Sequence, residues 1–261
     1  MRLFDSHCHL DDSSYDPDLN EVLQRAIENR VLSAMVVGTH LESSRKAVVL
    51  ADRFLGLYAS VGVHPHDAKT CSEAVMVELM DLAKNPKVRA WGETGLDFNR
   101  MFSPRADQEK WFLRQLEVAD SLNLPVILHE RDSLGRFYDI LKDSHNPART
   151  GVVHCFSGNK KEMEQVLDLG YHIGITGIVT QASRGETLRK LVPRIPADRL
   201  LIETDAPYLT PAPHRNKFRR NEPAFVLSVL LKIAEVRKED PETLGETLWQ
   251  NTCRLYQIKA D

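Results

Sequence analysis

The chain has few cysteines, and they follow no pattern. Cys8, Cys71, Cys155 and Cys253 are far apart and form no C-x-x-C pair. This excludes a disulfide framework and a cysteine-rich zinc ribbon, and it favours a reducing compartment. The first residues lack a basic segment followed by a long apolar one, and no run of about eighteen apolar residues occurs. We therefore expect a cytoplasmic protein without a secretory signal or a membrane association.

The chain also lacks a strong excess of charge of either sign, since its net charge is −3 at pH 7. This balance gives no global attraction for nucleic acid, although a local basic patch is sufficient for binding. No internal repeat, low-complexity tract or linker is visible. Because 261 residues with 42% hydrophobic content can build one substantial core, we predict a single domain over residues 1–261.

Short apolar runs alternate with amphipathic segments along the whole chain. Eight runs predict parallel strands that are buried on both faces, at Leu3–Ser6, Ala34–Gly38, Tyr58–Val63, Val88–Trp91, Val126–Leu128, Val152–His154, Tyr171–Ile175 and Leu200–Glu203. The clearest helical patterns lie at Leu19–Arg30, Asp107–Leu122, Lys161–Leu169, Phe225–Ala234 and Pro241–Cys253. Eight such units favour a closed α/β TIM (β/α)8 barrel. An open doubly wound sheet is the alternative, but no G-x-G-x-x-G follows the first strand.

Side chains that bind metal ions stand at or just past the ends of five of these runs. They are His7, His9, Glu93, His129, His154 and Asp205. A parallel barrel gathers the carboxyl ends of its strands around one mouth, so we expect these groups to converge there as a divalent-metal site. Independent salt bridges and caps are the alternative, which the recurrence at five strands disfavours. Asp5, two residues before His7, is expected to hold an imidazole N–H.

Other polar residues near the strand ends have less specific interpretations. His64 and His66 end the third strand and are candidates for substrate binding, with a purely structural turn as the alternative. Arg131 should point into the same mouth, where a guanidinium suits a phosphate, unless it pairs with a neighbour such as Asp132. Glu203 is expected to pair with the arginines or the Asn-Glu segment of the loop that follows the eighth strand.

That loop, Tyr208–Pro223, is predicted to be irregular and to cover the barrel mouth. It contains the densest basic run of the chain. Arg219 and Arg220 are expected to attract a polyanion, and Phe218 is available to stack on a base. The alternative is a solvated loop with internal ion pairs.

Short motifs occur in a fixed order along the chain. They are HCH, GVHPHD, GETGLDFNR, Gln108, LHERD, HCFSG, GITGIVT, LLIETDAPYLTP and RRNEP. As an ordered set, they resemble the TatD family of metal-dependent deoxyribonucleases, part of the amidohydrolase-like barrel superfamily. The resemblance covers essentially the whole chain. The bacterial TatD branch typically lacks the initial H-x-H, which this chain keeps, and this favours a site with two metal ions.

The resemblance implies how the ligands divide. One ion would take His7, His9, Glu93 and Asp205, and a second would take Glu93, His129 and His154, with Glu93 as the bridge. It further implies 3′-to-5′ exonuclease action on single-stranded DNA, with RNA as a second polymer, and the use of Mg²⁺ or Mn²⁺. The histidine-rich set would also hold Zn²⁺. Asp205 is the best candidate for the general base beside the catalytic Glu93, and no obligate protein partner is inferred.

Two other functions remain open from the residues. The same site would serve a metal-dependent hydrolase of esters or amides, such as a D-aminoacyl-tRNA deacylase. A metal-bearing barrel that only binds partners is the other, and the presence of all six ligand candidates disfavours it.

Overall fold

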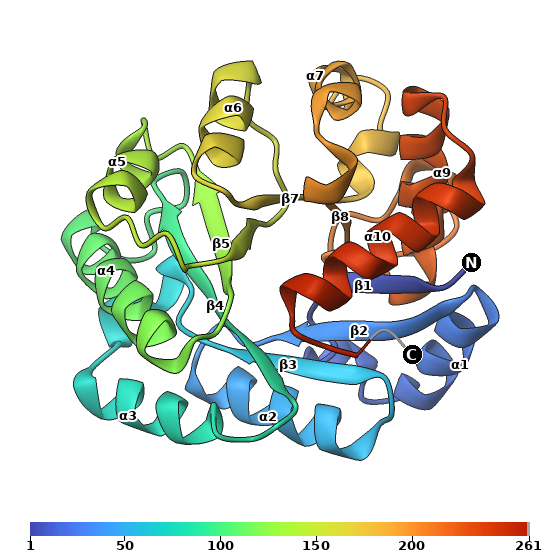
Figure 1. Ribbon diagram of the computed structural model, residues 1–261. Helices are drawn as coiled ribbons and strands as arrows, with labels where there is room; N and C mark the ends of the chain where they lie inside the picture. The colour runs from blue at the N-terminus through green and yellow to red at the C-terminus, as the bar shows by residue number, and fades with distance from the viewer. Residues whose placement is uncertain (260–261) are drawn as a thin grey trace.

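The computed structural model describes residues 1–259, in which eight parallel strands form one sheet (Figure 1). The strands follow one another in chain order around the sheet, so each pairs with its sequence neighbours. They are β1 Leu3–Cys8, β2 Val31–Val37, β3 Leu57–Val61, β4 Val88–Asp97, β5 Val126–Arg131, β6 Gly151–Val153, β7 His172–Ile175 and β8 Leu200–Ile202.

Helices surround the strands on the outside of the sheet, except that α10 crosses one end of the barrel (Figure 1). They are α1 Leu19–Glu28, α2 Leu41–Arg53, α3 Glu73–Leu82, α4 Arg105–Leu122, α5 Arg136–Asp143, α6 Lys160–Asp168, α7 Glu186–Leu191, α8 Ala212–Arg215, α9 Val226–Arg237 and α10 Pro241–Leu255. The five helices expected from the sequence are present with shifts at their ends. Every helix within residues 1–259 is too short or too polar to cross a bilayer.

The barrel closes where the ends of β1 and β8 meet. The amide of Asp205 donates to the carbonyl of His7 (2.9 Å), and the amide of His9 donates to the carbonyl of Ala206 (2.7 Å). Cys8 and Ala206 form an isolated parallel bridge at the same place. The prediction of a TIM (β/α)8 barrel is confirmed, and its closure brings His7 of β1 and His9 just after it beside Asp205.

The inner core of the barrel is separate from the larger core between the strands and the outer helices. Phe4, Ile127, Val152 and Leu201 belong to this inner cluster, together with Trp249 of α10 and Tyr256 just past the end of that helix. At the start of β8, the carbonyl of Leu200 accepts a hydrogen bond from the Asn251 side chain of α10 (3.0 Å). Helix α10 therefore packs over the amino ends of the strands, and the carboxyl ends form the mouth.

Strand β4 runs six residues further than the sequence predicted. Gly92 (φ 135°) and Gly95 (φ 148°) suggest the end of a strand in the sequence, yet both lie within β4, where the pairing with β5 shifts register between Trp91 and Thr94 and positive φ angles favour glycine. A Cβ on Gly95 would lie 1.9 Å from the carbonyl oxygen of His129, so glycine also lets β4 approach β5 closely. Glu93 consequently lies inside a strand and not past its end.

The segment Tyr208–Pro223 is less irregular than predicted, because it contains the short helix α8. Pro211 precedes this helix and Pro213 lies in its first turn. A proline is compatible with the first turn, where the missing N–H has no helical acceptor.

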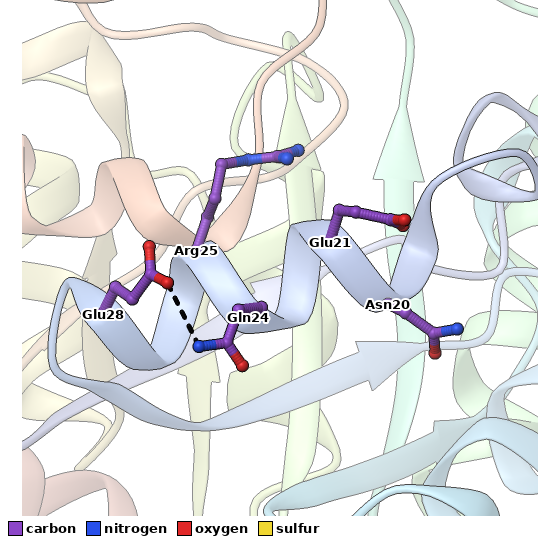
Figure 2. A pocket seen from close by; sticks show the side chains of 5 residues that line it. All are labelled: Asn20, Glu21, Gln24, Arg25 and Glu28. Carbon is purple, nitrogen blue, oxygen red and sulfur yellow. Dashed lines mark hydrogen bonds between the residues drawn. The ribbon is translucent and has the colours of Figure 1, made fainter.

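A shallow hollow lies on the outer surface of α1 (Figure 2). Its lining residues all come from that helix and are Asn20, Glu21, Gln24, Arg25 and Glu28. The Gln24 side-chain amide donates to the Glu28 carboxylate across it (3.1 Å). It contains none of the ligand candidates, so the chemistry of the chain lies elsewhere.

Candidate metal centre

Three strands extend their inner row of apolar side chains with a polar one at the mouth. The pairs, each two residues apart and therefore on one face of the sheet, are Ile127 with His129, Val152 with His154, and Leu201 with Glu203. The first member of each pair lies in the inner core, so the second enters the mouth of the barrel. The fold thus gathers imidazoles and carboxylates from distant parts of the sequence.

The first cluster joins β1, β4 and the segment after β8. His7 Nε2 lies 3.4 Å from Glu93 Oε2 and 3.7 Å from Asp205 Oδ1. His9 Nε2 lies 3.4 Å from Asp205 Oδ1 and 3.2 Å from His7 Nε2. Ligands about 2.1 Å from a tetrahedral ion are about 3.4 Å apart. His7, His9 and Glu93 lie close enough together to hold one divalent cation, and Asp205 contacts both histidines beside them.

The second cluster uses the other oxygen of Glu93. Glu93 Oε1 lies 2.8 Å from His129 Nδ1 and 3.5 Å from His154 Nε2. His154 also lies against the first cluster, because its ring stacks on the His7 ring (3.6 Å between centroids) and its Nε2 lies 3.9 Å from Asp205 Oδ1. One carboxylate therefore contributes an oxygen to each cluster, as a ligand shared by two ions would.

The charges of the site balance one another. Burial alone would raise the pKa of Glu93, but His154 and the hydrogen bond from His129 hold it well below its ordinary value. Burial opposes charge on His9 as well, yet Asp205 raises the pKa of that imidazole to about 9. A buried carboxylate without such partners costs several kcal/mol. Bound cations would take over this compensation from the protons on the histidines.

In two histidines, a hydrogen bond at Nδ1 determines which ring nitrogen is free to bind a metal ion. His9 Nδ1 lies 3.1 Å from the carbonyl of Val37, and His154 Nδ1 lies 3.0 Å from Glu203 Oε1. Both partners accept a hydrogen bond, so Nδ1 carries the proton in the neutral ring. Nε2 then presents a lone pair to the site, as a metal ligand must.

His64 shows the opposite arrangement. Its Nε2 lies 3.5 Å from Glu93 Oε1 and 3.3 Å from His129 Nδ1, close enough to count with the second cluster. However, its Nδ1 accepts a hydrogen bond from the backbone N–H of His66 (3.0 Å), which leaves the proton on Nε2. Burial lowers the pKa of His64 to about 4, so the ring is neutral near pH 7. His64 therefore presents a donor and not a ligand.

Glu203 was missed as a member of this site. Its Oε1 accepts from His154 Nδ1 and from the amide of Cys155 (2.5 Å), and its Oε2 accepts from the Ser6 hydroxyl (3.2 Å). The prediction that it pairs within the loop after β8 is wrong, because it lies on the inward face of the barrel and is fully buried. Its spacing of two residues from Asp205 and from Leu201 was the available signal.

Asp5 does not hold an imidazole, contrary to the prediction. Its carboxylate accepts from the amide (2.8 Å) and the hydroxyl (2.5 Å) of Thr204, and it approaches only the backbone amide of His7 (3.4 Å). A register shift in β1 between Asp5 and Cys8 breaks the simple alternation on which the prediction depended. Burial raises the pKa of Asp5 to about 8. This residue anchors the segment that carries Asp205.

His66 and Arg131, both predicted to bind substrate, lie at the mouth in different states. His66 Nε2 is bonded to the buried Asp97 carboxylate (2.7 Å). Arg131 ends β5 with an exposed side chain, and its guanidinium has no hydrogen-bond or ion-pair partner within residues 1–259. Its alternative partner, Asp132, instead accepts from the Asn99 side chain (2.7 Å). Arg131 remains available to an anion.

The cations of the basic loop differ in whether they form ion pairs with other side chains. Arg220 is held by Asp18, with contacts of 2.7 and 2.8 Å, and its guanidinium lies 4.4 Å from the centroid of the Tyr15 ring. The alternative of an internal ion pair therefore applies to Arg220, and its predicted contact with substrate is not supported. Arg219 is exposed and has no such partner in the described part of the chain, and Phe218 is 46% exposed.

Comparison with known protein families identifies the family to which this chain belongs. The family model described as TatD related DNase matches residues 4–257. The chain belongs to this family. That confirms the resemblance seen in the motifs and makes the chain a metal-dependent nuclease of the TatD family, a hydrolase of phosphodiester bonds.

The sequences of several relatives align with this chain over nearly their full length. The 3′-5′ ssDNA/RNA exonuclease TatD of Cronobacter sakazakii is 44% identical over 261 residues, covering 99% of both chains. That of Pectobacterium carotovorum is 41% identical over 98% of this chain. The crystal structure of the TatD homologue YjjV from Escherichia coli superposes with a TM-score of 0.89 at 32% identity and covers 99% of both chains.

Proposed function

We propose that this TatD-family chain is a 3′-to-5′ exonuclease of single-stranded DNA, with RNA as a second polymer substrate, and that it works with two divalent ions. The shared position of Glu93, with one oxygen in each cluster, carries the proposal of two ions. The names of the relatives support single-stranded DNA and RNA as substrates and the 3′-to-5′ direction of cleavage.

The ligands divide between the two clusters. His7, His9 and Asp205 would hold one ion with Glu93, and His129 and His154 would hold the other with the same carboxylate. When bound, the ions supply Lewis acidity to the phosphate and lower the pKa of a water near it. The nitrogen-rich set suits Mn²⁺ and Zn²⁺, while Mg²⁺ would use mainly the two carboxylates.

Side chains of the protein provide the proton transfers and the phosphate contacts. Asp205 lies at the mouth end of its cluster and is the candidate to accept a proton from the attacking water. The Nε2–H of His64 would donate to a phosphate oxygen beside the second cluster, and Arg131 would pair with the phosphate through its planar fork. His66 would support His64 through the backbone N–H bond between them.

The function is tested by following an internally labelled single-stranded oligonucleotide with Mn²⁺, Mg²⁺ or Zn²⁺. We expect successive release of 5′-mononucleotides from the 3′ end, and slower release from a blunt duplex of the same sequence. Release from the 5′ end would refute the polarity. Turnover of carboxylic esters or D-aminoacyl-tRNA, without release of nucleotides, would refute the proposal as a whole.

The two arginines of the basic loop should differ in their contribution. Arg219→Ala is expected to raise the KM for single-stranded DNA about threefold at low salt and to weaken its salt dependence, since one free cation is lost. Arg220→Ala should leave the KM within about twofold and lower the free energy of unfolding by up to about 1 kcal/mol, because it breaks a partly exposed pair with Asp18. Steady-state kinetics at several salt concentrations, with urea unfolding, separate the two; equal KM effects would contradict the division.

A further inference from the structure

All exposed aromatic rings of the described chain lie at the mouth of the barrel. The sequence contains 9 Phe, 6 Tyr and 3 Trp. Within residues 1–259, only Phe102, Tyr208 and Phe218 are exposed. Phe102 follows β4, and the other two follow β8. A single exposed apolar side chain needs no explanation, but the restriction of all exposed rings to the end that holds the ligand candidates does.

Two of these rings lie beside different clusters of the metal centre. The Tyr208 ring is 6.0 Å from the ring of His9, which belongs to the first cluster. The Phe102 ring is 4.8 Å from His66, whose ring lies 4.2 Å from that of His64 on the side of the second cluster. Tyr208 therefore lies beside the first cluster and Phe102 on the side of the second, and Glu93 is shared by the two clusters.

Both rings are placed to receive a flat apolar group. Phe102 meets His66 at an interplanar angle of 75°, and Tyr208 meets His9 at 62°. Edge-to-face contacts of this kind leave ring surface uncovered, and the two side chains are 54% and 56% exposed. Each histidine behind them is itself fixed, because His66 is bonded to Asp97 and His9 to a strand carbonyl. Both aromatic rings therefore rest against imidazoles that hydrogen bonds hold in place.

The denser group of exposed cations at the mouth lies in the loop after β8 and favours one direction for the bound strand, while Arg100 and Arg105 are exposed beside Phe102. The loop that begins with Tyr208 carries the exposed cations Arg215, Lys217 and Arg219, none of which has a side-chain partner within residues 1–259. A polynucleotide places its remaining phosphates along such a path. The end of the strand, which has a single phosphodiester to offer, then lies on the opposite side, at Phe102.

We propose that Phe102 stacks on the 3′-terminal base and that Tyr208 stacks on the penultimate base, on either side of the scissile phosphate. This inference rests on the proposed exonuclease function and deepens it. Stacking accepts any base because every base has an apolar face, so these residues bind substrate without selecting a sequence. Substrate and transition state benefit alike, so the effect falls on KM and not on kcat.

The test uses abasic substrates. Phe102→Leu is expected to raise the KM for an intact single strand about tenfold, and to add no further loss when the 3′-terminal residue of the oligonucleotide is abasic. Tyr208→Leu should behave in the same way with an abasic penultimate residue. Phe102→Tyr and Tyr208→Phe keep the rings and should keep the KM within about twofold. Leu55→Ala, at a 97% exposed side chain remote from the mouth, serves as the distant control.

Each outcome decides the matter. An unchanged KM in both leucine variants, or an equal loss on intact and abasic strands, overturns the stacking roles while leaving the exonuclease intact. A reversed pairing of variant and abasic position overturns the assigned direction. If the wild-type protein releases no nucleotide from single-stranded DNA, the proposed function is refuted, and this inference falls with it.

Discussion

Glu93→Gln is expected to lower the rate of nucleotide release by at least about a thousandfold, with the fold retained. The glutamine has the same shape, but its NH2 end presents no lone pair, so one of the two clusters loses its oxygen ligand. The remaining oxygen is neutral and binds a divalent cation more weakly than a carboxylate. Both metal positions are therefore weakened by a single change.

The measurement combines kinetics with the number of bound ions. Wild-type protein should bind two Mn²⁺ ions per chain in equilibrium dialysis and lose activity on chelation, whereas the variant should bind at most one. Glu130→Gln is the matched control, because Glu130 lies on the same strand as His129 but bonds to Ser133. Full activity of Glu93→Gln, or two ions bound with unchanged affinity, would contradict the shared-ligand arrangement.

The sequence was sufficient for the barrel because its signals are local and repeated. Eight apolar runs predicted eight strands, and the parallel order followed from the intervening helices. The ligand candidates followed from one geometric rule, that the carboxyl ends of barrel strands meet. His7 and Asp205 illustrate this, since they are distant in the sequence while His7 Nε2 lies 3.7 Å from Asp205 Oδ1 in the structure.

Other parts of the site depend on contacts that no local pattern records. The end of β4 was misplaced because Gly92 and Gly95 signal a break in a sequence and permit a bulge in a sheet. The proton on His64 Nε2 depends on a backbone N–H that caps its other nitrogen. Arg220 looked like a free cation until the fold placed Asp18 beside it. Each of these features depends on contacts that form only in the folded chain.

Glu203→Gln is expected to reduce metal affinity or activity about 10- to 100-fold, although Glu203 touches neither ion nor substrate in the proposed site. Its carboxylate accepts from His154 Nδ1, and this bond fixes the ring and makes Nε2 a stronger donor. Glutamine retains an oxygen for one acceptor position but removes the negative charge. Titration of activity against Mn²⁺ measures the effect, and saturating metal should restore most of the rate if the role is positioning.

A second substitution reaches the same carboxylate from the neighbouring strand. A Cβ added at Gly174 would lie 2.5 Å from Glu203 Oε2 and 2.8 Å from both its Cδ and its Oε1, so the buried carboxylate would have to shift. Gly174→Ala should therefore displace Glu203 from His154 and lower the free energy of unfolding, and it should raise the Mn²⁺ requirement in the same direction as Glu203→Gln. Because both changes act through one contact, the double variant should be no worse than the more severe single variant. Fully additive losses would show that the two residues act independently and would remove Glu203 from its positioning role.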